Sequence, residues 1–167
     1  MSETRWRLVV HGGAGSMRPG RLDPEQERCA RAGLEQALTE GSAILERRES
    51  ALAAVEAAVR VLEEDECFNA GRGSVLTATG CIELDAAIMD GRTRAAGAVA
   101  GLRTTRAPIS LARELLEHGP HVFLSGHGAD EFARDHGLEQ VANSWFEVPE
   151  RRRQLHELLG EIGRAHV

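Results

Sequence analysis

Apolar side chains recur every three to four residues in several parts of the chain, a spacing typical of helices with one buried face. The predicted helices run from Pro24 to about Gly41, from Ser50 to residues 64–66, from Pro108 onward, over residues 129–136 and, more loosely held, from Pro149. Asp23 and Ser50 are suited to capping the first two, because their side-chain oxygens can accept hydrogen bonds from the first turn.

Shorter apolar runs, separated by glycine-containing turns, have the character of strands. The predicted strands are Arg5–Val10, Ser74–Thr79, Ile82–Met89, Ala95–Leu102 and His121–Leu124. The connections at Gly80 and Gly91 are short, so the middle three strands are expected to form an antiparallel meander. Helices followed by antiparallel strands and another helix are typical of an α+β fold rather than of a repeated βαβ unit.

Composition narrows the possible partners. The 167 residues carry a formal charge of −6 and 42% are apolar, which suits one compact domain. The one basic run, Arg151–Arg153, is followed by Glu157 and Glu161, so neither a nucleic-acid nor an anionic-membrane surface is expected. The apolar run Leu8–Val10 is too short for a signal peptide or a membrane span, and we expect a cytoplasmic protein.

Cysteine and histidine spacing does not predict a metal centre. Cys29, Cys67 and Cys81 are odd in number and lack C-x-x-C spacing, so reduced thiols are expected rather than a disulfide framework or a thiolate zinc site. Four histidines between His118 and His136 lack the paired spacing of a structural zinc site. We interpret them as exposed or turn residues.

Candidates for catalysis are few. Asp85 and Asp90 are five positions apart, which places them on opposite faces of a strand rather than in a catalytic pair. Asp90 fits an Asp-Gly turn, whereas Asp85 is predicted as a buried hydrogen-bond hub or, alternatively, a catalytic carboxylate. The loop His11–Gly15 lacks the spacing of a phosphate-binding loop, and nothing in the sequence around Cys67 or Cys81 would activate its thiol.

The end of the second predicted helix is unusual, since Glu64, Asp65 and Glu66 oppose the helix dipole there. The segment from Leu62 to Gly73 is therefore expected to leave helical geometry. Its exposed carbonyls need either a cation or a hydrogen-bonding loop as partner, and the residues alone leave both open.

Five blocks follow one another in order from residue 8 to about residue 136. They are Val9–Gly15, Leu62–Glu64 with Phe68–Thr77, Glu83–Gly91, Ala96–Ala100 and Pro108. In order and approximate spacing they resemble the α portion of the plant-type L-asparaginase/isoaspartyl aminopeptidase family. Five blocks in register are highly specific, whereas any one alone would be weak.

The resemblance implies a fold and an activity. In that family a precursor cuts its own backbone before a threonine, and the α and β chains together form one αββα four-layer sandwich. Residues 1–148 would be the α part of this domain and residues 149–167 a charged helical tail or linker before the cleavage site. The implied protein is an N-terminal-nucleophile hydrolase, assembled as (αβ)2 without an organic cofactor. It hydrolyses L-asparagine to aspartate and ammonia, isoaspartyl (β-aspartyl) peptides, or both.

The resemblance also assigns roles to residues. The nucleophilic threonine is expected on the partner β chain, so this chain supplies support: Asn69 resembles the asparagine that approaches that threonine, and His11, Gly12 and Gly13 resemble a segment near the scissile peptide. A structural sodium ion is implied, held by main-chain carbonyls of Leu62, Glu63, Asp65, Phe68, Ala70 and Arg72. Asp65–Glu66 and Arg72 depart from the family's usual residues, which carbonyl ligation tolerates.

Two other interpretations remain. Glycosylasparaginase or a threonine aspartase would share the nucleophile and differ in substrate. A catalytically inactive metabolite-binding module would use the same scaffold without hydrolysis. The preference between asparagine and an isoaspartyl peptide is left open, because the family's pocket residues lie mostly on the β half.

Overall fold

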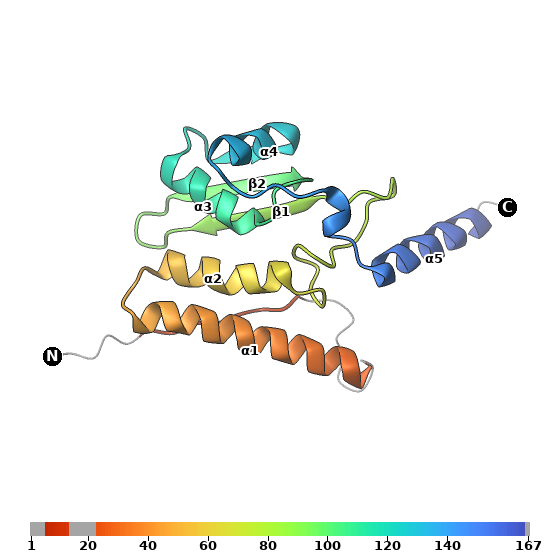
Figure 1. The fold of residues 1–167 in the computed structure, drawn as a ribbon, viewed down its shortest axis with the longest axis horizontal. Coiled ribbons are helices and arrows are strands. Elements are labelled where there is room, and N and C mark those ends of the chain that lie inside the picture. The colour runs from red at the N-terminus through yellow and green to blue at the C-terminus, as the bar shows by residue number, and fades with distance from the viewer. Residues whose placement is uncertain (1–5, 14–22, 166–167) are drawn as a thin grey trace.

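The computed structural model describes residues 6–13 and 23–165. The helices in this part of the chain are α1 (Pro24–Glu46), α2 (Ala51–Glu64), α3 (Pro108–His118), α4 (Gly126–Asp135), the 3-10 turn η1 (Asn143–Trp145) and α5 (Pro149–Ala165) (Figure 1). The strands are β1 (Leu84–Met89), β2 (Ala96–Leu102) and β3 (Phe123–Ser125). The α+β class predicted from the sequence is confirmed, and so is each predicted helix.

The helix starts follow the capping residues. The Asp23 side chain accepts a hydrogen bond from the Glu25 N–H at 3.3 Å, and the Ser50 hydroxyl accepts one from the Ala53 N–H at 3.1 Å. α1 runs past its predicted end at Gly41 to Glu46. Gly41 is buried against α2, where a side chain would meet the Ala54 carbonyl at 3.0 Å, so this glycine serves helix packing rather than termination.

The three strands form one sheet in the order β1-β2-β3. β1 and β2 pair antiparallel, as predicted, while β3 pairs parallel to β2 after the crossover through α3. β3 begins two positions later than the predicted strand at His121.

Two predicted strands are absent from the described residues. The segment Ser74–Thr79 makes only an isolated bridge, Leu76 to Ile82, because the chain turns back at once through hydrogen bonds between Thr77 and Cys81. In the predicted strand Arg5–Val10, residues 6–10 pair with no strand, and Val9 is 88% exposed rather than buried. Arg5 itself lies outside the described residues. A strand is defined by its ladder, and residues 6–13 and 23–165 supply no ladder for either segment.

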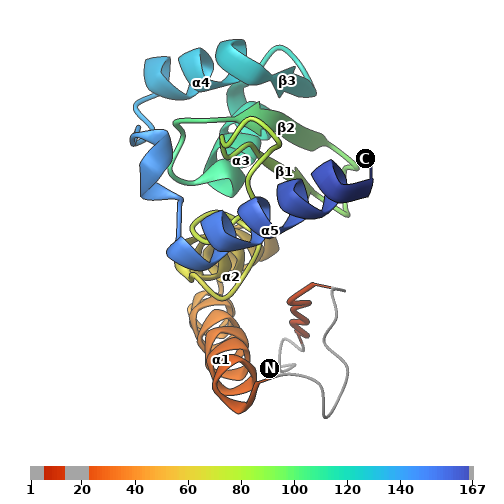
Figure 2. The ribbon, with the colours of Figure 1, turned by 90° about the vertical axis from the view of Figure 1, so that its right-hand side faces the viewer.

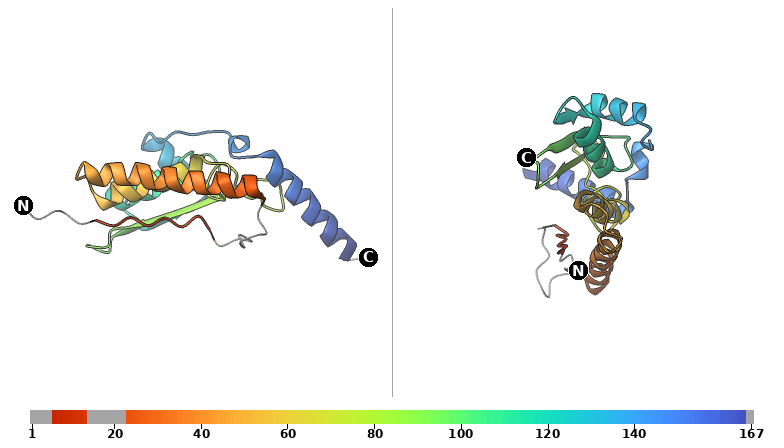
Figure 3. Two further views of the ribbon diagram at one scale, coloured as in Figure 1. Left: turned by 90° about the horizontal axis from the view of Figure 1, so that it is seen from below. Right: turned by 90° about the vertical axis from the view of Figure 1, so that its left-hand side faces the viewer.

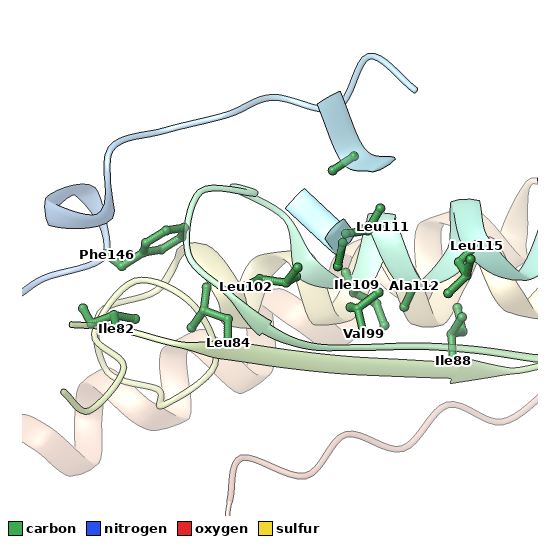
Figure 4. Packing of buried hydrophobic residues seen from close by; sticks show 12 residues of the cluster. Ile82, Leu84, Ile88, Val99, Leu102, Ile109, Leu111, Ala112, Leu115 and Phe146 are labelled. Atoms are coloured by element: carbon green, nitrogen blue, oxygen red, sulfur yellow. The ribbon is translucent and has the colours of Figure 1, made fainter. Parts of the chain in front are cut away.

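One face of the sheet is packed and the other is bare. Leu84, Ile88, Val99 and Leu102 point toward α3, which lies along one side of the sheet (Figure 4). Ala87, Ala98 and Phe123 are register partners across the three strands, and their side chains lie on the opposite face. Ala87 and Phe123 are exposed there, so the described chain is one sheet covered by helices on a single side.

α1 and α2 form an antiparallel pair beside β1, below the sheet in Figure 2. Their contact contains a second, smaller apolar cluster of Ala37, Ala58, Leu62 and Phe68. α5 projects from the body of the molecule, as the left view in Figure 3 shows. Among the described helices, none is both long and apolar enough to cross a bilayer.

Candidate functional site

The segment after α2 folds back on itself. α2 ends at Glu64, Asp65 takes an extended conformation, and the Arg72 N–H returns to donate to the Glu63 carbonyl at 2.7 Å. Gly71 lies so close to the Glu63 backbone that an added Cβ would collide with its carbonyl. The predicted departure from helical geometry is confirmed, and a glycine is required for the return.

Asn69 lies in this segment with its side chain fixed. Its Oδ1 accepts a hydrogen bond from the Val75 N–H at 2.9 Å, which leaves the amide NH2 as a free donor among the described residues. The preceding residue, Phe68, is 3% exposed and anchors the segment in the α1–α2 cluster. Asn69 is therefore an exposed polar side chain on a well-anchored backbone.

The glycine loop reaches the same place. Gly12 packs against Phe68, since a Cβ there would meet the Phe68 ring at 3.0 Å, and the His11 Nδ1 accepts a hydrogen bond from the Gly13 N–H at 3.1 Å. His11, Gly12, Gly13 and Asn69 line one open pocket of about 720 Å³. Two predicted site segments that are far apart in sequence, residues 11–13 and Asn69, thus share a single cavity.

The end of α2 and the segment after it form a further part of the wall, and the rest was not predicted. That rest comes from the start of α1, from the start of α5 and from the residue before α5: Gln26, Ala30, Val148, Glu150, Arg151 and Gln154. The Arg151 Nε donates to the Gly73 carbonyl at 2.7 Å, so the start of α5 is held while its later residues Leu158 and Leu159 are exposed. The only sequence signal was the helical spacing after Pro149, which predicts a helix without saying where it packs.

A second pocket of about 460 Å³ lies on the other side of Asn69, between α2 and β1. Its wall includes Glu63, Glu83 and Asp85. Asp85 is exposed, with Oδ1 accepting from the Gly101 N–H at 2.8 Å, so the predicted buried hub is wrong at this position. Alternation along β1 turns Asp85 to the bare face.

Glu63 is the buried acid of this pocket, with 3% exposure. Its Oε1 accepts a hydrogen bond from the Ile109 N–H at 2.8 Å in the first turn of α3. Burial raises the pKa of Glu63 to about 8, because it disfavours the charged form more than the Ile109 hydrogen bond and the nearby Arg60 favour it. A largely protonated Glu63 therefore links the end of α2 to the start of α3 at neutral pH.

The prediction that the three cysteines are reduced is wrong for two of them. Cys29 of α1 and Cys67 form a disulfide bond, and only Cys81 is free. Sequence spacing could not reveal this pair, because α1 and the segment after α2 approach each other only in the folded chain. The four histidines from His118 to His136 are exposed, as predicted, and form no metal-binding group within the described chain.

The six carbonyls predicted to hold sodium belong to the returning segment. Those of Glu63 and Asp65 accept hydrogen bonds from the N–H groups of Arg72 and Phe68, and each keeps a lone pair. Main-chain oxygens near a helix C-terminus are ligands suited to a hard cation. The hydrogen-bonding loop that the sequence left open as a partner is present, and the sodium ion stays a prediction.

The sequence that forms this pocket is similar to those of known proteins. The family model described as Asparaginase matches residues 4–165. The chain belongs to the asparaginase family. It is 49% identical over 134 residues to an isoaspartyl peptidase/L-asparaginase of Mus musculus, and 43% identical over 148 residues to an isoaspartyl peptidase of Salmonella typhimurium.

A third asparaginase relative extends the match along nearly the whole chain. A plant-type L-asparaginase of Pyrococcus abyssi is 43% identical over 162 residues, which is 96% of this chain and 50% of that protein. The mouse and Salmonella matches cover 80% and 89% of this chain but 40% and 47% of those proteins. The chain therefore spans about half the length of the relatives it matches.

Proposed function

We propose that this chain is the α part of an amidohydrolase that cleaves L-asparagine, isoaspartyl peptides, or both. One observation carries the proposal: the pocket that gathers Asn69 and the glycine loop has no serine or threonine among its described lining residues, and its one cysteine, Cys67, is disulfide-bonded. The described lining therefore contains residues suited to support a reaction but no free hydroxyl or thiol group to act as the nucleophile. The relatives' additional length provides a segment from which it would come.

In the proposed reaction, a threonine at the head of a β chain attacks the side-chain amide carbon of the substrate. Its α-amine, with a reference pKa of about 8, takes the hydroxyl proton. The leaving ammonia or amine departs with a proton, and water hydrolyses the acyl-enzyme to release aspartate. Asn69 contributes its NH2 as a hydrogen-bond donor beside the threonine, because Oδ1 is already engaged by Val75.

The bare face of the sheet supports a β partner. Small side chains at Ala87 and Ala98 and exposed apolar ones at Met89 (57%) and Phe123 (55%) make a flat surface suited to a second sheet. Such a layer would complete a four-layer sandwich, and a repeat of the pair would give (αβ)2. Residues 6–10, which pair with no strand among the described residues, would find a strand partner there.

We further propose that the carbonyls of Leu62, Glu63, Asp65, Phe68, Ala70 and Arg72 hold a sodium ion that fixes the Asn69 segment. Exchange of sodium for the bulky cation choline at constant ionic strength should lower the melting temperature by several degrees. A Gly71→Ala variant should melt lower in either salt and respond less to the exchange, since its collision with Glu63 distorts the turn. Equal melting of the wild type in both salts would exclude a structural role for sodium.

The complete gene product tests the activity. Its intact mass and N-terminal sequencing should show two polypeptides, the second beginning with threonine, and assays should detect ammonia from L-asparagine or free aspartate from a β-aspartyl dipeptide. A single uncut polypeptide that binds these compounds without hydrolysis would favour a metabolite-binding module. Hydrolysis restricted to glycosylated asparagine would instead place it with the glycosylasparaginases.

A further inference from the structure

The disulfide between Cys29 and Cys67 joins α1 to the segment that carries Asn69. Its two residues are 38 positions apart, and Cys67 lies two residues before Asn69 in the wall of the candidate pocket. Cys29 is an exposed residue of α1, so the bond lies at the surface of the helix on the Cys29 side.

The tether works together with a packing contact one helical turn away. Gly33 follows Cys29 by one turn of α1, and a side chain at Gly33 would collide with both the Asp65 carboxylate and the Phe68 ring. Asp65 in turn accepts the Cys67 N–H at 2.9 Å. The segment is therefore attached to α1 at two adjacent turns, covalently at Cys29 and by contact at Gly33.

Asp65 also lies close to both sulfur atoms, and the three groups have ligand atoms within 4.8 Å of one another. They do not make a persuasive metal site. Bonded sulfurs lack the thiolate charge that binds zinc, and three groups fall short of the four ligands of a structural site. The disulfide bond, rather than a metal ion, therefore links these residues.

Resting on the proposed function, we propose that the Cys29–Cys67 disulfide is a reversible redox tether that holds Asn69 in its catalytic position. A thiolate of a dithiol reductant attacks the Cys29 Sγ and forms a mixed disulfide, while Cys67 leaves as a thiolate and takes a proton. The second thiol of the reductant then releases Cys29 as a thiol and closes the reductant's own disulfide. Two electrons and two protons pass to the protein. The non-covalent contacts of the segment, among them the packing of Asp65 and Phe68 against Gly33, then hold it without the covalent bond.

The experiment compares the complete gene product after oxidised glutathione and after dithiothreitol, with alkylation and intact mass recording the state of the bond. Hydrogen exchange of peptides spanning residues 65–75 should quicken about tenfold after reduction, and KM or kcat should change about threefold or more. Cys29→Ser should show the reduced behaviour in both treatments. Cys81→Ser, which leaves the tether intact, should respond as the wild type does.

Two results would overturn the tether. One is a pair of free thiols at Cys29 and Cys67 after oxidation; the other is exchange over residues 65–75 that is equal before and after verified reduction. If no form hydrolyses either substrate but exchange still responds to reduction, the proposed activity fails and the redox-dependent tether remains without a catalytic role. Unchanged kinetics in an active enzyme whose exchange does respond would refute control of Asn69.

Discussion

The Asn69 side chain is held by a hydrogen bond to its carbonyl oxygen, which leaves its NH2 group without a partner among the described residues. The carbonyl oxygen is engaged by the Val75 N–H, and the residue lies at the boundary of both pockets. The NH2 group is the part available to a reacting partner. This division allows the structural role of the side chain to be separated from its chemical role.

Asn69→Asp should keep the acceptor for Val75 and lose the donor, so the fold should persist while kcat falls about 100-fold. Asn69→Ala should lose both and also lower the melting temperature. Steady-state kinetics on the complete protein, paired with thermal melts, measure the two effects. A fully active Asn69→Asp enzyme would remove the donor role.

The buried hydrogen-bonded carboxylate predicted at Asp85 is found instead at Asp130. At 4% exposure, it accepts the N–H groups of Arg103, Thr104 and Thr105 and the Thr105 hydroxyl, at 2.7 to 3.3 Å. Sequence could not identify it, because its donors lie more than twenty positions away and α4 has an ordinary helical pattern. Burial raises the pKa of Asp130, but these hydrogen bonds lower it more, so it lies below its ordinary value.

Asp130→Asn should therefore destabilise the fold by about 3 kcal/mol at neutral pH, because an amide replaces charge-assisted hydrogen bonds. The stabilisation from a depressed pKa is present above the unfolded value of 3.8 and is lost as pH falls through the folded value. The gap between wild type and variant should thus narrow below pH 3.8. Urea denaturation across pH measures it, with exposed Asp135→Asn on the same helix as the unaffected control.

At the scale of elements, helices were predictable and several strands were not. The helices carry their own start signals and apolar stripes, so α2 begins after its cap Ser50 and α3 begins at Pro108, as the sequence indicates. A strand depends on a partner, and the segment Ser74–Thr79 has the right composition but turns back too early to pair. In the candidate site, the glycine loop and Asn69 could be predicted, whereas the α5 wall and the disulfide depend on tertiary approach.

The close approach of α3 to β2 at Gly97 predicts the effect of adding one methyl group there. Gly97 of β2 is buried under α3, and an added Cβ would collide with the Ala112 carbonyl and meet the Leu116 Cβ at 3.0 Å. Gly97→Ala should destabilise the protein by about 1–3 kcal/mol, because α3 must lift from the sheet. Gly91→Ala, in an exposed turn with free space around it, should stay within about 0.5 kcal/mol in the same denaturant titration.

At the scale of the whole molecule, the described helices cover the sheet on one side only. Helices α3 and α4 cover one side of a three-stranded sheet, and the opposite side carries Ala87, Ala98 and Phe123 in register. The arrangement can bury a core on one side while leaving the other as an interface. Assembly and folding should therefore respond to different substitutions.

Ala87→Arg should abolish association with the proposed β chain and with it the activity, because a long charged side chain would be buried between two layers. The α part itself should stay folded, since Ala87 is exposed in this chain. Size-exclusion chromatography and circular dichroism separate the two outcomes. Ala32→Arg, on the exposed side of α1, is the matched control, and equal assembly of both variants would contradict the interface.

The alanines of the bare face also determine how closely a second layer can approach the sheet. With methyl groups in place of long side chains, an opposing layer could settle closer than the ~10 Å usual for stacked sheets. The distance between Asn69 and any reacting group on that layer would then be set by the packing of the two backbones, with little room for adjustment. Ala98→Leu would then push the opposing layer away from the sheet. It would lengthen the distance between Asn69 and the reacting group without changing either group chemically.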